Sequence, residues 1–185
     1  MKKQKITGSD LLFVIHYHKT VRPHYDLRLE INGTMPSWAI PKGPTLDPMV
    51  KRLAMETTEH DLDYRHFEGI IPEGAYGAGA VIVWDEGTYI AEHEIDKGIR
   101  EKITDPEKSL EQMQHGLRNG EIKFTLHGKK LKGSFALIKT RGFGPKNSWL
   151  FIKHKDTHCV AGYDAKNFPL SVKSKQTIEE LSARV

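Results

Sequence analysis

Two imidazoles, a carboxylate and a guanidinium fall within eleven residues near the start of this chain, as His18, His24, Asp26 and Arg28. Side chains alternate between the two faces of a β-strand, so His24, Asp26 and Arg28, spaced i, i+2 and i+4, would share one face. Neutral imidazole and carboxylate are typical ligands of a divalent transition metal, and a guanidinium suits a phosphate. The run predicts a metal beside an anion-binding arginine, which indicates phosphate ester chemistry.

The residues between these polar positions are apolar, which supports the strand interpretation. Tyr25, Leu27 and Leu29 would leave the opposite face and pack into a core. His18 has the same parity as the polar residues, but Pro23 indicates a turn, so we expect His18 to reach the site from the preceding strand. The alternative, an exposed polar strand face without chemistry, is left open by the spacing alone.

The composition indicates one soluble globular domain. The chain has 185 residues, of which 38% are hydrophobic and 28% are charged. No stretch approaches the roughly 18 apolar residues of a membrane-spanning helix, and no apolar segment of a signal peptide follows the basic start. The single cysteine, Cys159, has no partner for an internal disulfide, which favours a reducing cytoplasm. A net charge of +4 permits a polyanionic partner without requiring one.

Short apolar runs separated by Gly and Pro turns predict a mainly β fold, a β-barrel or sandwich with a few short α-helices. Asn32-Gly33 predicts a type I′ hairpin, and Asp85-Glu86-Gly87 predicts a second one between strands at 80–84 and 88–91. Asp105-Pro106 starts a helix and Thr177–Glu180 forms a capping box. Further strands are expected at 52–58, 121–126, 133–139 and 149–153, and a turn-rich connection at 69–79.

Four other polar residues are candidates for the same site. Lys42 stands on a Pro-Gly loop, and Arg52, His60 and Tyr64 follow it. Taken one at a time, each is better explained as a surface residue or, for Tyr64, as a packing aromatic. The glycine-rich stretch at 74–79 lacks the Gly-Lys-Ser/Thr ending of a P-loop. No covalent phosphotransfer motif is present either, so phosphate chemistry here would use metal-activated water and electrostatic clamping.

A succession of motifs, in order along the chain, closely resembles the 3′-phosphoesterase domain of bacterial DNA ligase D. The motifs are Phe13-Val-Ile-His-Tyr-His18, His24-Tyr-Asp-Leu-Arg-Leu-Glu30, Ser37-Trp-Ala-Ile-Pro-Lys-Gly-Pro44, Lys51-Arg-Leu-Ala54, Glu59-His60, Phe67-Glu-Gly69, Ile71-Pro-Glu-Gly-Ala-Tyr-Gly-Ala-Gly79 and Leu131-Lys-Gly-Ser-Phe-Ala-Leu137. The resemblance covers about Leu11 to Lys155. It predicts a short N-terminal arm at 1–10, a 3′-phosphoesterase β-barrel domain at 11–155, and a C-terminal extension at 156–185 whose short helix packs on or near the barrel.

The resemblance implies a Mn²⁺-dependent enzyme, with Co²⁺ or Zn²⁺ as other candidate metals, that heals the 3′ ends of DNA or RNA–DNA primer strands. Such enzymes hydrolyse a 3′-phosphate to a 3′-hydroxyl and also remove a terminal ribonucleoside to leave a 3′-phosphate. The implied metal ligands are His18, His24 and Asp26. The implied residues around the scissile phosphate are Arg28, Lys42, Arg52, His60 and Tyr64, with His60 as candidate acid because an unperturbed histidine titrates near neutrality.

Three features depart from the family pattern: His16 stands where Gln is usual, Pro23 replaces a common Leu, and the segment before the barrel is short. The short arm makes the phosphomonoesterase the firmer expectation of the two activities. With no ligase or polymerase motif, the sequence predicts a stand-alone cytoplasmic repair enzyme that works with a separate DNA ligase and no membrane. Two alternatives stay open: a non-haem Fe(II) facial-triad oxygenase on a β-barrel, and a catalytically inactive nucleic-acid-binding barrel.

Overall fold

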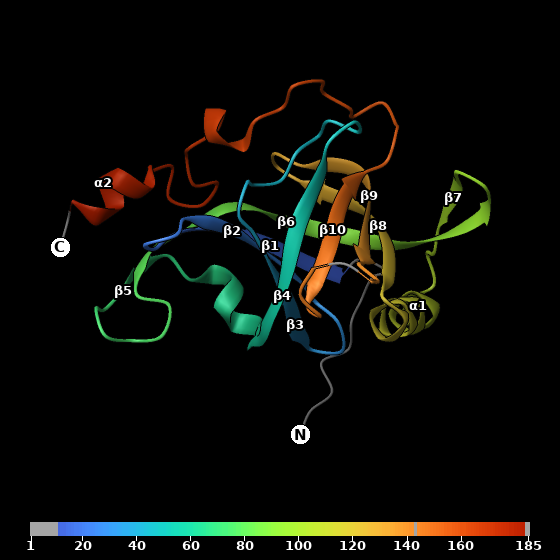
Figure 1. Cartoon of the computed structure of the whole chain (residues 1–185), viewed down its shortest axis with the longest axis horizontal. Helices are drawn as coiled ribbons and strands as arrows, with labels where there is room; N and C mark the ends of the chain where they lie inside the picture. The colour runs from blue at the N-terminus through green and yellow to red at the C-terminus, as the bar shows by residue number, and fades with distance from the viewer. Residues whose placement is uncertain (1–10, 143, 184–185) are drawn as a thin grey trace.

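The computed structural model describes residues 11–142 and 144–183, and the N-terminal arm predicted at 1–10 lies outside them. One sheet has the strand order β1-β2-β3-β4-β10-β9-β8-β6-β5, and β6 also pairs with β1, so the sheet curls into a ring (Figure 1). The elements are β1 (Leu11–Lys19), β2 (His24–Leu29), β3 (Thr34–Ile40), β4 (Lys51–Asp61), η1 (Leu62–His66), β5 (Gly69–Ile71), β6 (Gly79–Asp96), β7 (Ile99–Lys102), α1 (Pro106–Asn119), β8 (Glu121–Gly128), β9 (Lys132–Lys139), β10 (Ser148–Lys153), η2 (Ala165–Asn167) and α2 (Ile178–Ser182). The predicted mainly β barrel with a few short helices is confirmed.

The core lies inside this ring and receives the apolar face of β2. Tyr25, Leu27 and Leu29 are buried in one large apolar cluster, as their alternation predicts. Trp38 and Trp149 meet edge-on in the same cluster, with ring centroids 5.6 Å apart. Because these apolar side chains fill the inside of the barrel, the polar residues of β2 are left on the other face of the sheet.

Local sequence signals set several turns and helix ends. Asn32 and Gly33 have φ of 55° and 80°, the left-handed conformations that a type I′ hairpin requires. Asp105 caps α1 by accepting a hydrogen bond from the backbone N–H of Lys108 at 2.9 Å. The predicted capping box is also present at the start of α2. These predictions are confirmed because each depends on residues close in sequence.

The hairpin predicted around Asp85-Glu86-Gly87 is wrong, because β6 runs through it as one strand of 18 residues. The Asp85 carboxylate accepts hydrogen bonds from the backbone N–H groups of Lys129, Lys130 and Leu131 in the β8–β9 turn. Gly87 lies where a Cβ would sit 2.2 Å from the carbonyl oxygen of His127. In this turn-like sequence, Asp85 therefore stabilises the distant β8–β9 turn, and Gly87 allows β6 and β8 to approach closely. The short strands β5 and β7 were not predicted.

The segment after β10 lies across one end of the barrel (Figure 1). The indole of Trp84 donates to the carbonyl oxygen of Phe168 at 2.8 Å, and the backbone N–H of Val172 donates to that of Val83 at 2.9 Å. Ile178 of α2 packs in a small apolar cluster with two residues of β6. These contacts place α2 on the side of the barrel that carries β5 and the end of β1.

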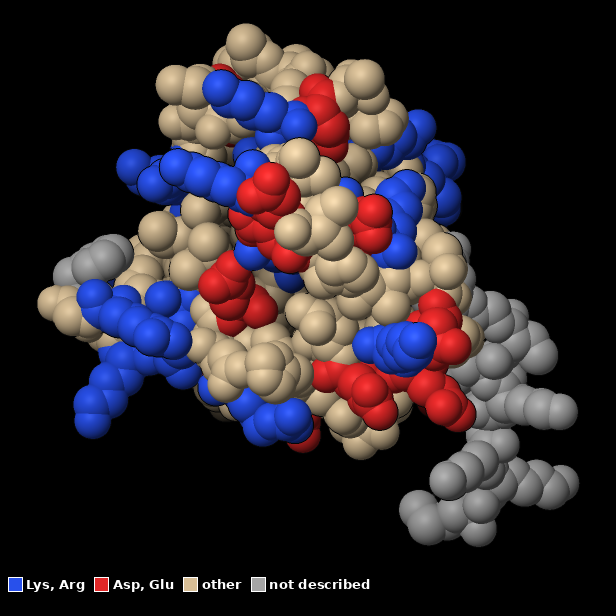
Figure 2. Space-filling view, turned by 90° about the vertical axis from the view of Figure 1, so that its right-hand side faces the viewer, with Lys and Arg blue, Asp and Glu red and all other residues tan. Residues whose placement is uncertain are grey.

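The face that carries α1 and β7 shows acidic and basic side chains interspersed (Figure 2). Lys123, for example, pairs with both Glu94 and Glu121. Such mixing is typical of a solvated surface and gives no field of a single sign. In the part of the chain that the structure describes, no helix has both the length and the apolar character needed to cross a bilayer.

Replacing Asp85 by alanine should destabilise the fold by about 3 kcal/mol, because it leaves backbone N–H groups of the β8–β9 turn without an acceptor in a buried setting. Asp85→Asn keeps one carbonyl oxygen and should lose about half as much. Chemical denaturation of both variants measures the difference. Equal stability of Asp85→Ala and the wild type would contradict this role for the carboxylate.

Candidate active site

A cavity of about 480 Å³ opens beside the ends of β1 and β2, on the polar face of the sheet. Its walls come from β1, β2, β4, η1, the end of β5 and the two loops at residues 20–23 and 72–78. Six of the residues singled out in the sequence line it together: His18, His24, Asp26, Arg28, His60 and Tyr64. The structure thus gathers side chains that are up to 46 positions apart in the chain into one site.

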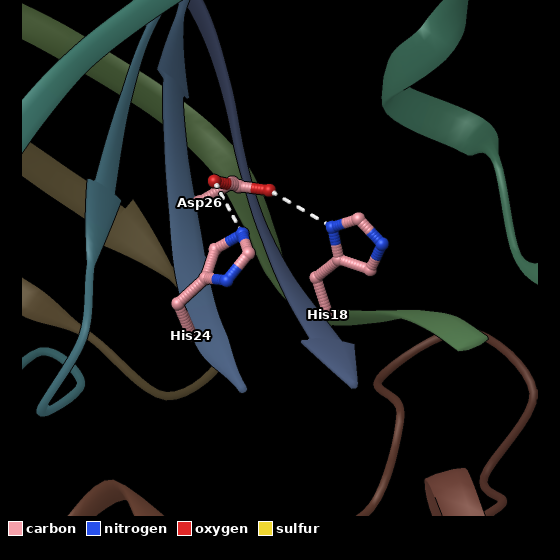
Figure 3. A group of neighbouring side chains, drawn as sticks. All are labelled: His18, His24 and Asp26. Carbon is pink, nitrogen blue, oxygen red and sulfur yellow. Dashed lines mark ion pairs between the residues drawn. The ribbon is translucent and has the colours of Figure 1, made fainter. Parts of the chain in front are cut away.

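His18, His24 and Asp26 face one another across the β1–β2 pair (Figure 3). Asp26 Oδ1 lies 3.4 Å from His24 Nε2, and Asp26 Oδ2 lies 3.7 Å from His18 Nδ1. One ligand atom from each residue falls within 4.8 Å of the others. His18 and His24 are direct partners in the antiparallel register, which explains how a histidine from the preceding strand joins the set.

Backbone carbonyls fix which nitrogen of each ring is available. The carbonyl oxygen of Gly77 lies 2.7 Å from His18 Nε2, and that of Arg22 lies 2.9 Å from His24 Nδ1. A carbonyl can only accept, so these two ring nitrogens carry the protons. His18 Nδ1 and His24 Nε2 then carry no proton, and the lone pair of each faces the Asp26 carboxylate. Two imidazole nitrogens and a carboxylate oxygen in this arrangement are the ligand atoms that a transition-metal cation prefers.

A proton on His24 can provide the positive charge that a metal cation would otherwise bring to these atoms. The pKa of His24 is raised, first by its hydrogen bond with Asp26. Burial alone would raise the pKa of Asp26, but the facing rings of His18 and His24 and the charge of Arg28 hold it well below its usual range. Asp26 is therefore an anion at neutral pH, and the cluster attracts a positive charge.

Arg28 is the most connected side chain of the site, although it is only 3% exposed. Its Nε donates to His16 Nδ1 at 3.1 Å, and its Nη2 donates to Asp26 Oδ2 at 3.0 Å. Its Nη1 donates to Ser37 Oγ at 3.0 Å and to His60 Nδ1 at 2.9 Å. A guanidinium has five N–H groups, so one N–H on Nη2 stays outside these four bonds.

Two histidines around Arg28 are held neutral. Burial, followed by the charge of Arg28, lowers the pKa of His16 to about 3. Burial and Arg28 also lower the pKa of His60, which differs from the unperturbed value expected from the sequence. Since His60 Nδ1 accepts from Arg28, the ring proton of neutral His60 is on Nε2.

Tyr64 serves both packing and the site. Its ring stacks on Phe67, with centroids 5.2 Å apart and planes 13° from parallel, and it lies 4.7 Å from the ring of His60. The guanidinium carbon of Arg28 sits 5.2 Å from the centre of the same ring. Tyr64 therefore restricts where Arg28 and His60 can move, which fits the packing interpretation and a place at the site.

Lys42 and Arg52 do not line this cavity. Lys42 is exposed in the turn after β3, and Arg52 lies on β4 eight positions before His60. Their contact with the phosphate stays a prediction. Sequence reasoning missed Ser37 and the two carbonyls that orient the histidines; a serine has no distinctive spacing, and a carbonyl leaves no trace in the residue letters.

Residues 16–139 match the family described as the DNA ligase D 3′-phosphoesterase domain. The chain belongs to this family. The matched segment contains all the residues named above for the metal cluster and for Arg28 and its partners, so the site of this 3′-phosphoesterase family member lies inside the shared region.

Full-length relatives show the same likeness. The chain is 41% identical over 180 residues to the multifunctional non-homologous end joining protein LigD of Pseudomonas aeruginosa. The matched residues make up 96% of this chain and 19% of that protein. It is 37% identical over 178 residues to the LigD DNA repair protein of Mycobacterium tuberculosis, covering 96% and 20%. The chain thus spans about a fifth of the length of the curated relatives it matches.

Replacing His16 by glutamine should make the free energy of unfolding less dependent on pH below about pH 6. The pKa of His16 is near 6.5 when unfolded and about 3 when folded, so between these values the unfolded chain binds the extra proton. Stability therefore falls with falling pH, by about 1 kcal/mol per pH unit from this group. The glutamine side chain would not titrate, while its carbonyl oxygen could still accept from Arg28 Nε.

Denaturation in EDTA at several pH values between about 4 and 6 measures this slope. His115→Gln, at an exposed position of α1, is the matched control and should keep the wild-type slope because the ring is exposed in both states. Identical slopes for wild type and His16→Gln would show that the buried ring is not the source of the acid sensitivity.

Proposed function

We propose that this chain is a Mn²⁺-dependent phosphoesterase that hydrolyses a 3′-phosphate at a nucleic-acid end to a 3′-hydroxyl. The observation that carries the proposal is the shared carboxylate: Asp26 faces the free nitrogens of two histidines with one oxygen each and receives Arg28 Nη2 on Oδ2. Asp26 therefore connects a candidate cation site with an arginine that could bind a phosphate. Membership of the 3′-phosphoesterase family points to the same activity.

His18 Nδ1, His24 Nε2 and Asp26 fit a divalent transition metal by the chemistry of their donor atoms, and Mn²⁺ is the metal we propose, with Co²⁺ or Zn²⁺ as substitutes. When bound, such an ion polarises a phosphate oxygen or lowers the pKa of a bound water. The carbonyls of Gly77 and Arg22 keep the two rings turned toward Asp26, as expected of partners that orient metal ligands.

The residues around the cluster would hold the phosphate group. Arg28 keeps one N–H of Nη2 for a phosphate oxygen, and its other bonds fix the direction of that N–H. Neutral His60 can donate a hydrogen bond from Nε2 to the leaving oxygen, and it would transfer a proton only after the ring has taken up a second one. A bound phosphate dianion would raise the pKa of His60 toward its ordinary range, because the negative charge favours the protonated ring.

The proposed substrate is the 3′ end of a DNA strand or of an RNA–DNA primer-template, held by its backbone because end repair cannot depend on sequence. Removal of a 3′-terminal ribonucleoside is proposed as the second reaction of the same site. The relatives are named for non-homologous end joining and DNA repair, which supports a place in strand-break repair in the cytoplasm, with a DNA ligase sealing the healed end.

The decisive assay incubates the chain with a 5′-labelled primer-template whose primer ends in a 3′-phosphate or in one ribonucleotide. Wild type with Mn²⁺ should convert the 3′-phosphate to a 3′-hydroxyl, and EDTA should abolish the reaction. His24→Ala should lose at least about 100-fold in rate because a metal ligand is gone. His115→Ala, an exposed histidine on α1, is the matched control and should keep full activity.

A 3′ end that does not change with metal, or equal rates for His24→Ala and wild type, would contradict the proposed function. Turnover of a small substrate that requires Fe(II) and oxygen would favour the oxygenase alternative instead. In the same assay, undiminished activity of His60→Ala from about pH 5 to pH 8 would remove the proton-donor role of His60.

Arg28→Lys should lower kcat by about 100-fold although it keeps the positive charge. A lysine ammonium has three donors on a flexible stem and cannot reproduce bonds to His16, Asp26, Ser37 and His60. Single-turnover kinetics on the 3′-phosphate strand measures the loss, and circular dichroism checks that the variant is folded. A rate within a few-fold of wild type would show that charge alone suffices at this position.

A further inference from the structure

The mouth of the candidate active site carries two apolar side chains that are almost entirely in solvent. Val21, on the turn between β1 and β2, is 101% exposed, and Tyr76, on the loop between β5 and β6, is 94% exposed. In the described part of the chain, no other large hydrophobic side chain is as exposed as these two. Both line the same cavity as Asp26 and Arg28.

The loop that carries Tyr76 is tied to the metal cluster. The carbonyl of the next residue, Gly77, accepts the hydrogen bond from His18 Nε2 at 2.7 Å. Within the loop, the backbone N–H of Ala75 donates to the carbonyl oxygen of Pro72 at 3.2 Å. These bonds hold the backbone at Tyr76 close to the ligands, while its exposed ring can turn about its side-chain torsions to meet a bound group.

Polarity changes across the cavity in the way that a nucleotide requires. The floor holds the buried Asp26–Arg28 pair and the histidines, which suit a phosphate and a cation. The mouth holds an aromatic ring and an aliphatic side chain, which suit a flat apolar group, beside the cationic side chain of Arg22, which suits a strand's phosphate backbone. Single exposed apolar side chains are ordinary on protein surfaces, but here two line one cavity whose buried residues suit a phosphate. A nucleobase stacks on aromatic side chains whatever its identity, because every base has a π-face.

We propose that Tyr76 stacks on the base of the nucleotide that carries the scissile 3′-phosphate, with Val21 covering the base from the β1–β2 turn. The proposal rests on the proposed function and adds a base-binding subsite to it. It makes the substrate class narrower: a 3′-phosphate on a nucleotide with a base is favoured over the same phosphate on an abasic sugar. It also leaves the enzyme indifferent to which base is present, as a repair enzyme requires.

The test compares two strands that differ only in the terminal nucleotide, one with a base and one abasic, both ending in a 3′-phosphate. Tyr76→Ala should raise KM for the base-bearing strand by about tenfold with kcat little changed, because stacking contributes to binding rather than to the reaction. KM for the abasic strand should not change. Tyr76→Phe keeps the ring and should behave as wild type on both strands.

Met49→Ala is the matched control, because Met49 is 80% exposed and does not line the cavity. It should leave KM for both strands unchanged. A Tyr76→Ala effect of equal size on the two strands would overturn the stacking proposal, since the ring would then act on something other than the base. So would an unchanged KM for the base-bearing strand.

A binding measurement reports the stack directly. The base-bearing strand carries 2-aminopurine at its 3′-terminal position and a 5′-fluorescein, and it ends in a 3′-methylenephosphonate, whose P–C bond is not hydrolysed. It is titrated with protein and Zn²⁺. Anisotropy of the fluorescein reports binding, and quenching of 2-aminopurine reports stacking. Wild type and Tyr76→Phe should quench, and Tyr76→Ala should not. Binding without quenching by wild type overturns the stack while the proposed function stands. If wild type shows no turnover of any 3′-phosphate strand with metal, the proposed function fails instead.

Discussion

The arrangement of the site depends on one constraint, that a buried guanidinium must have its hydrogen bonds satisfied. Arg28 is nearly inaccessible, and an unpaired charge at such a place would cost several kcal/mol. Its partners come from four strands in sequence order: His16 on β1, Asp26 on β2, Ser37 on β3 and His60 on β4. The curl of the barrel brings these neighbouring strands around one point. The guanidinium therefore links four neighbouring strands, and the cluster of His18, His24 and Asp26 is joined to this network through Asp26.

The loops at the mouth are linked to the same centre through the backbone. The turn at 20–23 contributes the carbonyl of Arg22, and the loop at 72–78 contributes that of Gly77. Because β1 pairs with β6, these two segments start from neighbouring strands, with Lys19 opposite Ala80. The groups that orient the histidines and the groups that would meet the base thus share two short segments. A change in either loop would affect the ligands and the substrate together.

What the sequence predicts well is local. The period of two along β2, the Asn-Gly hairpin and the helix caps each follow from residues that lie within a few positions of one another. The prediction fails at Asp85, because its turn-like neighbours are overridden by backbone N–H groups more than 40 positions away. The site shows the same division. The ligand types could be predicted from spacing, whereas Ser37 as a partner of Arg28 and Gly77 as a partner of His18 require the pairing of strands.

The charges in the cavity indicate that Arg28 would not hold a phosphate dianion by itself. Asp26 and Arg28 form a buried pair whose charges cancel, and His16 and His60 are held toward their neutral forms. The floor therefore offers a phosphate dianion little net positive charge beyond a proton on His24, and the other cationic side chain in the cavity lining is Arg22 on the β1–β2 turn. Lys42 and Arg52 do not line the cavity, so the charge that they would add to it stays a prediction. A divalent ion on the two histidines and Asp26 would change the sign of the floor, because two positive charges are added next to a neutral pair. Arg28 would then have two duties: to hold the carboxylate that binds the ion, and to direct its remaining N–H at the phosphate that the ion attracts.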